Sequence, residues 1–293
     1  MPSLARVAIV GASGQLGRAI VAERPPGVIA APAHAQVALE DEAALAALLD
    51  DAQPAVLINC AAFHHVDACE REPERALALN ALAVGRAAAL CEARGIAFVT
   101  ISSDYVFAGT AGRAYREDDA AWPQTVYGIS KLTGELLARR YPRTFVLRMS
   151  GIFGRAGSSN KGVTLIERVL GQAERGEPTR MVADVVFSPT YAPHAARAVW
   201  DLLDREAYGL HHVVNAGACS WYEFVQTAFR KAGLPDAPLA PVTYRELGNP
   251  TPRPLISPLE NTTFAGLGIA PLPHWHDALD AYLAPRRERA PSA

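Results

Sequence analysis

The chain opens, at residues 6–17, with the stretch RVAIVGASGQLG, and this stretch decides the fold. Its first part, up to Val10, is a continuous apolar run rich in β-branched residues, which is typical of a strand buried on both faces of a parallel sheet. Glycines follow at once, and we expect them to form a tight turn that leads into a helix over residues 15–24. A strand, a glycine-rich turn and a helix in this order predict the first unit of a Rossmann-type fold.

The glycine-rich turn is also a candidate cofactor site. Glycines let a pyrophosphate approach the backbone, and the start of the helix offers free N–H groups and a positive dipole end. The Gly-x-x-Gly-x-x-Gly spacing differs by one residue from the usual dinucleotide fingerprint, and the alternative is an ordinary strand-to-helix turn. The predicted cofactor contacts in the turn are Gly11, Ser13, Gly14, Gln15, Leu16 and Gly17.

Strand and helix patterns alternate along the next 130 residues. We expect strands at 28–31, 55–59, 96–101 and 143–149, and helices at 41–49, 74–93 and 126–140. This order predicts an α/β fold, a doubly wound parallel sheet with helices on both faces. The helix at 74–93 is apolar nearly all round, so we expect the sheet to cover it, and it would suit the interface of a homodimer.

The composition of the chain changes after residue 150, where glycine, proline and serine become frequent. Helices are expected at 162–175, 191–204 and 220–232, and seven prolines in 234–258 exclude a long helix or a central strand there. We predict a Rossmann domain at 1–150, to which 184–214 returns. A smaller C-terminal substrate-binding lobe is predicted at 151–183 and 215–293.

Composition limits the classes of function. The 293 residues carry a net charge of −2, so no strong field favours nucleic acid or an anionic membrane surface. The first apolar stretch is too short for a signal peptide or a membrane span. The four cysteines form no Cys-x-x-Cys pair, which indicates reduced thiols in a cytoplasmic protein. The adjacent His64 and His65 point apart and lack a third ligand, so no metal site is expected.

Three side chains form a candidate catalytic set. Tyr127 and Lys131 are four residues apart on a predicted helix and therefore share one face. An ammonium beside a phenol favours the phenolate, so we expect Lys131 to lower the pKa of Tyr127 and make it a proton donor usable near neutrality. Ser103 ends a predicted strand, where its hydroxyl can bind a substrate carbonyl. Together they indicate carbonyl reduction.

Other residues have both a functional and an ordinary interpretation. The end of the second strand usually selects the cofactor, and the lack of an acid there favours NADPH over NADH, with His34 either contacting a 2′-phosphate or lying on the surface. Arg253 could clamp a substrate diphosphate or lie exposed in a proline-rich loop. For Arg148 we expect a structural ion pair with a carboxylate such as Asp184, and for Trp221 a place in the core.

With these motifs, the chain resembles the dTDP-4-dehydrorhamnose reductase family of the extended short-chain dehydrogenases/reductases. The resemblance is carried by the glycine turn and by the strings SSDYVF at 102–107 and VYGISKL at 126–132, together with residues 59–62. It implies an NAD(P)H-dependent reductase of a nucleotide-linked 4-keto-6-deoxysugar, in dTDP-L-rhamnose or related deoxysugar biosynthesis. It also implies cofactor contacts from Ala61, Ala62, Asn80, Tyr127 and Lys131, and substrate contacts from His64, Asp104, Gly151 and Arg253.

The chain departs from the family at positions that face the sugar. His64 replaces a usual threonine, and Gly151 stands where an aromatic residue is common. The family pattern Asp-Gln-x-Gly-x-Pro-Thr appears as DVVFSPT at 184–190. These changes leave the catalytic set intact and concern the identity of the substrate. The alternatives are another nucleotide-sugar enzyme of the superfamily, an epimerase or dehydratase, and a non-catalytic NAD(P)-binding regulatory subunit.

Overall fold

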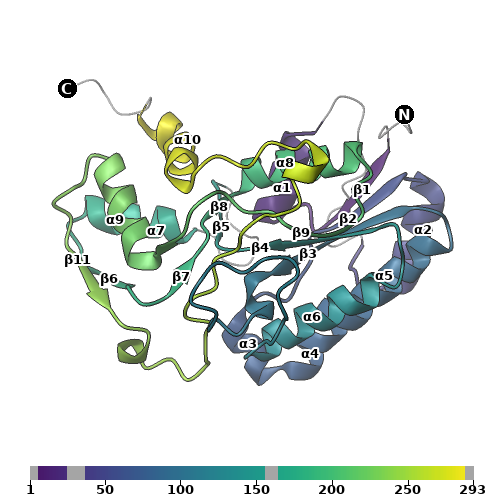
Figure 1. The fold of residues 1–293 in the computed structure, drawn as a ribbon, viewed down its shortest axis with the longest axis horizontal. Coiled ribbons are helices and arrows are strands. Elements are labelled where there is room, and N and C mark those ends of the chain that lie inside the picture. The colour runs from purple at the N-terminus through teal and green to yellow at the C-terminus, as the bar shows by residue number, and fades with distance from the viewer. Residues whose placement is uncertain (1–5, 25–36, 156–163, 288–293) are drawn as a thin grey trace.

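A five-stranded parallel sheet forms the centre of the molecule (Figure 1). The computed structural model describes residues 6–24, 37–155 and 164–287. The strands run in the order β1 (Val7–Val10), β2 (Val56–Asn59), β3 (Ala97–Ser103), β4 (Thr144–Met149) and β9 (Gly209–His212). Helices cover both faces, so the Rossmann-type doubly wound class expected from the sequence is confirmed.

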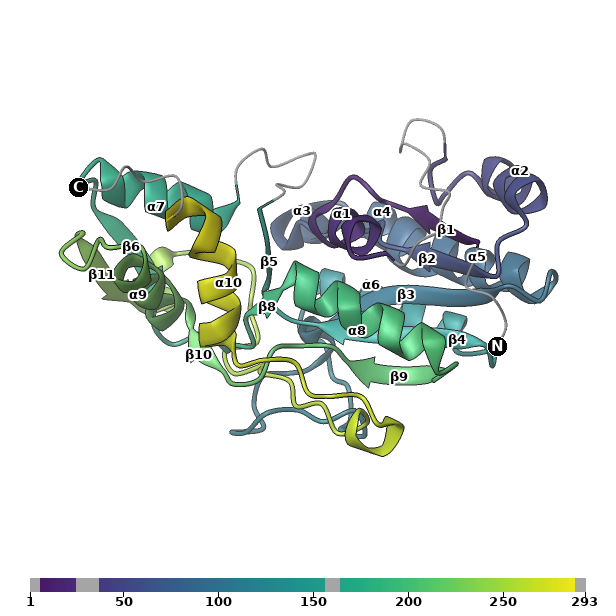
Figure 2. The ribbon, with the colours of Figure 1, turned by 90° about the horizontal axis from the view of Figure 1, so that it is seen from above.

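Alternation along each strand divides the core into two layers. On β1, Val7 and Ile9 pack with α1 (Gln15–Ala22) and α8 (Ala192–Asp204), whereas Ala8 and Val10 pack with α2 (Glu42–Ala52) and α5 (Ala83–Glu92). Figure 1 shows α1 and α8 on one side of the sheet and α5 on the other, and Figure 2 looks down on the face that carries α1 and α8. Successive side chains of a strand point to opposite faces, and helices cover both faces of this sheet, so all four residues of β1 are buried.

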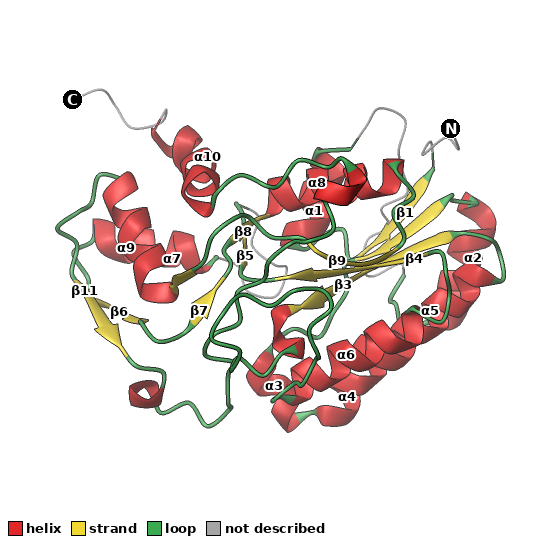
Figure 3. Cartoon of the chain, viewed as in Figure 1, coloured by secondary structure: helices red, strands yellow, loops and turns green. Residues whose placement is uncertain are grey.

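The helix expected over 74–93 is present, with one difference that the sequence did not show. It is divided into α4 (Pro73–Leu77), a π-helical turn (Ala78–Leu82) and α5, and it follows α3 (Val66–Arg71). The wider turn brings Asn80 into the interior, where it is 1% exposed. Leu82 is instead 52% exposed, so the helix is not covered all round. It packs against α6 (Val126–Ala138) along the lower face of the sheet (Figure 3).

A second group of helices forms a separate lobe. Here α7 (Leu165–Glu174), α9 (Trp221–Lys231) and α10 (Trp275–Arg287) share an apolar core that includes Leu170, Phe224 and Leu279. Two of these helices were expected, but α10 was not, since Pro285 and many charged residues obscure its pattern. Short strand pairs complete this part of the molecule: β5 (Ile152–Phe153) with β8 (Thr190–Tyr191), β7 (Val186–Phe187) with β10 (Cys219–Ser220), and β6 (Thr179–Val182) with β11 (Leu239–Val242).

Some expectations fall outside the described residues. The strand at 28–31 and His34 both lie there. The proline-rich stretch does contain strand β11, which includes Pro241 and pairs on one side only, with β6. Among the described helices, none has the length and hydropathy needed to cross a membrane. All four cysteines are unpaired thiols.

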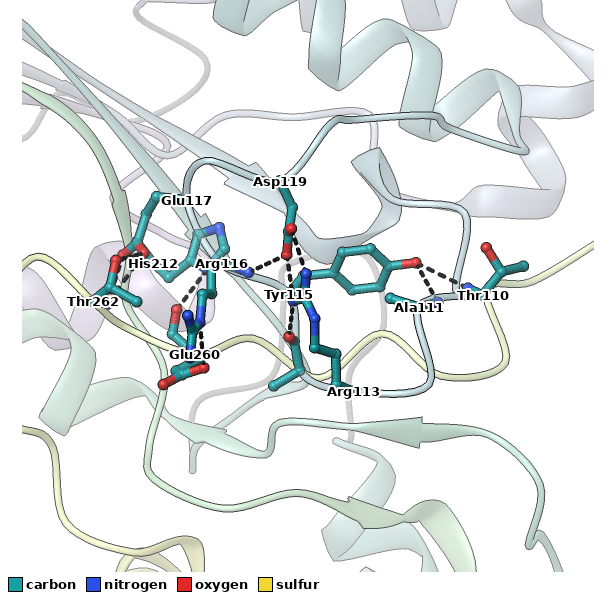
Figure 4. Close-up of polar contacts among 11 residues, drawn as sticks. Thr110, Ala111, Arg113, Tyr115, Arg116, Glu117, Asp119, His212, Glu260 and Thr262 are labelled. Atoms are coloured by element: carbon teal, nitrogen blue, oxygen red, sulfur yellow. Dashed lines mark hydrogen bonds and ion pairs between the residues drawn. The ribbon is translucent and has the colours of Figure 1, made fainter.

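The loop between β3 and α6 is fastened by polar contacts (Figure 4). The Tyr115 hydroxyl accepts hydrogen bonds from the backbone N–H groups of Thr110 and Ala111 at 2.9 and 3.1 Å. Glu117 accepts from the backbone N–H of His212 on β9 at 3.0 Å and from the hydroxyl of Thr262 at 2.6 Å. The loop therefore joins β3, β9 and the C-terminal segment at the carboxyl edge of the sheet.

Candidate functional site

The carboxyl end of β3 meets the start of α6 very closely. A Cβ on Gly128 would lie 2.2 Å from the carbonyl oxygen of Tyr105, so this approach requires glycine. Thr125 caps the helix by accepting the N–H of Gly128 at 2.9 Å. The ring of Tyr127 consequently meets the ring of Tyr105 edge-on, with 5.6 Å between centroids.

The three predicted catalytic side chains lie together at this junction. The Ser103 side chain lies close enough to the phenol of Tyr127 to lower its pKa. Ser103 Oγ also donates to Asp104 Oδ1 at 3.0 Å and accepts from the N–H of Tyr105 at 3.2 Å. Lys131 lies one turn further along α6, only 4% exposed. Within the described residues its ammonium donates no hydrogen bond of standard geometry, so its donors remain available to a ligand.

The net shift in the pKa of Tyr127 is opposite to the one expected. Burial raises the pKa of Tyr127 above its ordinary value, and this outweighs the effect of Ser103, which lowers it. Burial also lowers the pKa of Lys131, to about 8. The four-residue spacing of Tyr127 and Lys131 predicts that they share a helix face, but it does not predict how deeply the Tyr127 hydroxyl is buried. A neutral phenol at neutral pH is a proton donor, which is the form that reduction of a ketone requires.

The glycine turn has the shape of a phosphate cradle. Gly11 has φ +78°, and a Cβ there would lie 2.6 Å from the N–H nitrogen of Ala61, while one on Gly17 would lie 2.4 Å from the carbonyl oxygen of Gly11. Both glycines are required by the protein itself. Gly14 is not, because its φ is −74° and a Cβ would find only an ordinary contact at 3.5 Å. Gly14 precedes the first turn of α1, and the N–H groups of such a turn can bind a pyrophosphate.

A second feature of the turn indicates a ligand group that donates a hydrogen bond, such as a hydroxyl. Gln15 Oε1 is a buried acceptor with no hydrogen-bond donor among the described residues. A buried acceptor without a partner costs about 1–3 kcal/mol, which a ligand that donates to it would recover. Ser13 and Leu16 belong to the same turn, with Ser13 partly exposed and Leu16 packed into the core.

The loop after β2 borders the cradle. Ala61 and Ala62 are partly exposed, and the N–H of Ala61 donates to Asn59 Oδ1 at 3.0 Å. Asn80 does not extend freely toward this loop. Its Oδ1 accepts from the N–H of Phe63 at 2.8 Å, and its Nδ2 donates to the carbonyl of Phe63 at 2.9 Å and to Ser130 Oγ at 3.0 Å. Asn80 therefore ties the loop to α6.

Two predicted substrate positions have unexpected surroundings. Asp104 is 5% exposed and accepts hydrogen bonds from Ser103 and from Ser257, the latter at 2.7 Å, while burial raises its pKa to about 6. Gly151 has φ +50°, and a Cβ there would lie 2.2 Å from the ring of Phe187. Positions 151 and 187, which both depart from the family pattern, are thus in contact: glycine at 151 leaves room for the Phe187 ring. That ring stacks on the Trp221 ring, with 3.9 Å between centroids.

Arg253 lies against the tyrosines rather than on the open surface. Its Nη2 donates to Asp67 Oδ1 at 2.7 Å, and its guanidinium carbon lies 5.8 Å from the centroid of the Tyr105 ring. Its Nε donates to the Tyr244 hydroxyl at 3.2 Å. The proline-rich segment therefore brings a cation to the ring that contacts Tyr127. His64 is exposed, with Nδ1 3.4 Å from the carbonyl oxygen of Ala62.

Arg148 pairs with a different acid from the one expected. It forms a bidentate ion pair with Glu135 on α6, at 2.9 and 2.7 Å, while Asp184 accepts the N–H of Tyr244. Sequence reasoning missed Glu135, although its place four residues after Lys131 was a usable signal. Trp221 begins α9 and packs on the core of the second lobe, as expected.

Comparison with known proteins shows the family. A model described as the RmlD substrate binding domain matches residues 5–288. The chain is 36% identical over 286 residues to the spore coat polysaccharide biosynthesis protein SpsK of Bacillus subtilis, covering 97% of this chain and 98% of that protein. It is 33% identical over 281 residues to a dTDP-4-dehydrorhamnose reductase of Streptomyces griseus, covering 92% and 90%.

A solved structure agrees with this match. The dTDP-4-dehydrorhamnose reductase of Bacillus anthracis, in complex with NADP, superposes with a TM-score of 0.89 at 28% identity, covering 96% of this chain and 99% of that one. Similarity in sequence and in structure thus extends over nearly the whole length of each protein. The chain belongs to the RmlD substrate binding domain family, the family of the dTDP-4-dehydrorhamnose reductases.

Proposed function

We propose that this protein is an NAD(P)H-dependent reductase that converts the ketone of a nucleotide-linked 4-keto-6-deoxysugar to an alcohol, in dTDP-L-rhamnose or related deoxysugar biosynthesis. One observation carries the proposal: Ser103 and Tyr127 lie together at the end of β3, one turn from the buried Lys131. Such an arrangement polarises a carbonyl and supplies its proton. Relatives named as dTDP-4-dehydrorhamnose reductases support the choice of substrate class.

The cofactor would lie between the glycine turn and α6. The N–H groups at the start of α1, beside Gly14, would hold its pyrophosphate, and Gln15 and the loop at Ala61 and Ala62 would line its path. A bound reduced nicotinamide supplies the hydride. We favour NADPH over NADH, because a related structure contains NADP and no acid follows the expected second strand.

The proton chemistry belongs to the protein. Burial raises the pKa of Tyr127 further above neutrality, so the phenol keeps its proton near pH 7 and can donate it to the developing alkoxide, a far stronger base than a phenolate. Ser103 orients the carbonyl oxygen. Lys131 is mostly protonated at pH 7, with a pKa of about 8, and its positive charge stabilises the phenolate that remains. The ammonium is also free to bind the cofactor ribose.

The substrate would be held from the opposite lobe. Arg253, next to Tyr105, presents a guanidinium that can bind a diphosphate in bidentate fashion. His64 and Asp104 border the same junction, and the Phe187 ring beside Gly151 would replace the aromatic contact usual at position 151. Residues 1–150 with 184–214 would bind the cofactor, and 151–183 with 215–293 would bind the sugar nucleotide.

The test is turnover by Tyr127→Phe with NADPH and dTDP-4-dehydrorhamnose. Loss of the proton donor lowers kcat by about 100-fold or more, while NADPH still raises the melting temperature. Tyr222→Phe, on α9 in the other lobe, is the matched control and keeps its turnover. Near-normal turnover by Tyr127→Phe with cofactor bound contradicts the proposed role. NAD that co-purifies in a stoichiometric amount would favour an epimerase or dehydratase instead.

We further propose that the protein is a cytoplasmic homodimer. Leu82, Ile129 and Leu136 lie on the neighbouring segments that run from α4 to α6, and they are 52, 46 and 59% exposed. Burying such side chains against a second copy removes apolar surface from water. Light scattering on Leu136→Glu tests this: we expect a shift from dimer to monomer, and a wild-type monomer would contradict it. Unpaired cysteines are consistent with a reducing compartment.

A further inference from the structure

A buried acid continues the catalytic face of α6. Tyr127, Lys131 and Glu135 follow one another at intervals of four residues, so their side chains lie along one face of the helix. Lys131 is 4% exposed and Glu135 is 2% exposed. A charged residue is almost never buried to this degree without a partner, so the acid needs an explanation.

Two neighbouring strands hold the Glu135 carboxylate in place. Arg148 on β4 donates from Nε to Oε1 at 2.9 Å and from Nη2 to Oε2 at 2.7 Å. Ser102 on β3 donates its hydroxyl to Oε1, and the strand register places Ser102 directly beside Arg148. The carboxylate thus has three fixed donors and cannot turn away from α6.

The groups that face Lys131 come from three places. Cys60 follows β2, Cys69 lies on α3 and Glu135 lies on α6. Burial raises the pKa of Cys60 to about 12 and that of Cys69 to about 11, so both thiols are neutral near pH 7. Arg148, the nearby cation on β4, is bonded to Glu135. Among these three groups, Glu135 is the one that most strongly raises the pKa of Lys131, against the effect of burial.

We propose that Glu135 is a positioning residue that keeps Lys131 in its ammonium form, with Arg148 and Ser102 fixing the carboxylate that does so. Burial alone favours the neutral amine, and the nearby negative charge opposes that effect. The consequence for catalysis, a lasting positive charge beside the Tyr127 phenol, rests on the proposed reductase function. The charge relation itself can be measured without any cofactor.

The chain is well suited to that measurement, because it has only three lysines, Lys131, Lys161 and Lys231. The cofactor-free protein is labelled with a limiting amount of acetic anhydride over a range of pH, and peptide mass spectrometry follows the reactivity of Lys131. We expect a midpoint near pH 8 in the wild type. Glu135→Gln should lower it by about one pH unit, a tenfold loss in proton affinity. The matched control Glu92→Gln removes an exposed acid at the end of α5 and should leave the midpoint unchanged.

A second variant covers the case in which Glu135→Gln fails to fold, because its Arg148 guanidinium is buried and unpaired. The double variant Glu135→Gln/Arg148→Leu has no orphaned charge there, and its Lys131 midpoint should also fall. An unchanged midpoint in either folded variant overturns the proposal.

Kinetics separates this inference from the proposed function. The alkaline limb of kcat should move to lower pH in Glu135→Gln, because Lys131 then loses its proton earlier. A shifted labelling midpoint in a protein that does not reduce the sugar ketone supports the charge relation and contradicts the function. Normal wild-type turnover with an unshifted midpoint in the variant supports the function and overturns the role of Glu135.

Discussion

Replacing Gly128 by alanine tests how the catalytic tyrosine is placed. The added Cβ would lie 2.2 Å from the Tyr105 carbonyl oxygen and 2.9 Å from the Pro123 Cβ. To reach an ordinary contact, the first turn of α6 and the Tyr105 backbone have to separate by about 1 Å. The N–H of Gly128 also donates to the Thr125 cap, so the start of the helix would move with it.

The expected effect on activity exceeds the effect on stability. Overpacking typically costs about 1–3 kcal/mol, and the lower chain entropy of alanine offsets about 0.5–1 kcal/mol of that. A displacement of about 1 Å at a catalytic group can cost about 100-fold in rate. We therefore expect kcat for dTDP-4-dehydrorhamnose to fall about 100-fold, with a loss of about 1–2 kcal/mol in the free energy of unfolding.

The assay combines steady-state kinetics with urea unfolding. The matched control is Gly171→Ala in α7, where the nearest atom to the new Cβ is the flexible end of Arg175 at 3.4 Å. This control should keep its turnover and gain up to about 1 kcal/mol of stability. A Gly128→Ala protein with normal kcat would refute the reasoning that this contact places Tyr127.

Three other predictions follow from the same geometry. Gly14→Ala should leave the free energy of unfolding nearly unchanged and weaken NADPH binding, whereas Gly17→Ala should destabilise the cofactor-free protein. Urea unfolding and cofactor titration distinguish the two variants, and equal effects would contradict the assignment of Gly14 to the cofactor site. Arg253→Ala should raise KM for the sugar nucleotide about 10-fold or more and leave the Kd for NADPH unchanged, which substrate and cofactor titrations check. The folded-state pKa of Asp104 is raised from 3.8 to about 6, so its contribution to stability should fall by up to about 3 kcal/mol as pH rises from 4 to 6. In Asp104→Asn this dependence on pH should be absent, which urea unfolding at pH 4.5 and 6.5 measures.

Local patterns predicted the parts of the site that depend on local geometry. The apolar run before Gly11 and the glycine spacing are properties of one strand and one turn, and the structure has both. The shared face of Tyr127 and Lys131 follows from helical spacing alone. These features need no knowledge of what packs against them, which is why the sequence was sufficient for them.

Features that depend on packing were not accessible in the same way. The acid that pairs with Arg148 is set by the β3–β4 register and by how α6 crosses the sheet, and neither is written in the local sequence. The raised pKa of Tyr127 depends on burial, which reversed the direction expected from the neighbouring charge. The π-helical turn at Asn80 likewise has no signature in an alanine- and leucine-rich stretch.

The link between positions 151 and 187 shows a further limit. Each departs from the family pattern, and from the sequence they look like two separate losses. In the structure the Phe187 ring occupies the space that a side chain at 151 would need. Only the fold shows that the two positions are in contact.

The path of the chain has a consequence for engineering. The apolar core around α7, α9 and α10 uses residues from Phe153 to Leu283. Between them in sequence, however, α8 packs on the parallel sheet and β9 is one of its strands. A chimera in which a relative supplies the sugar-binding lobe therefore cannot be made with one junction, because any single junction divides one of the two apolar cores. Redesign of sugar preference in this scaffold has to proceed by coupled point substitutions, and a chimera needs several junctions made at once.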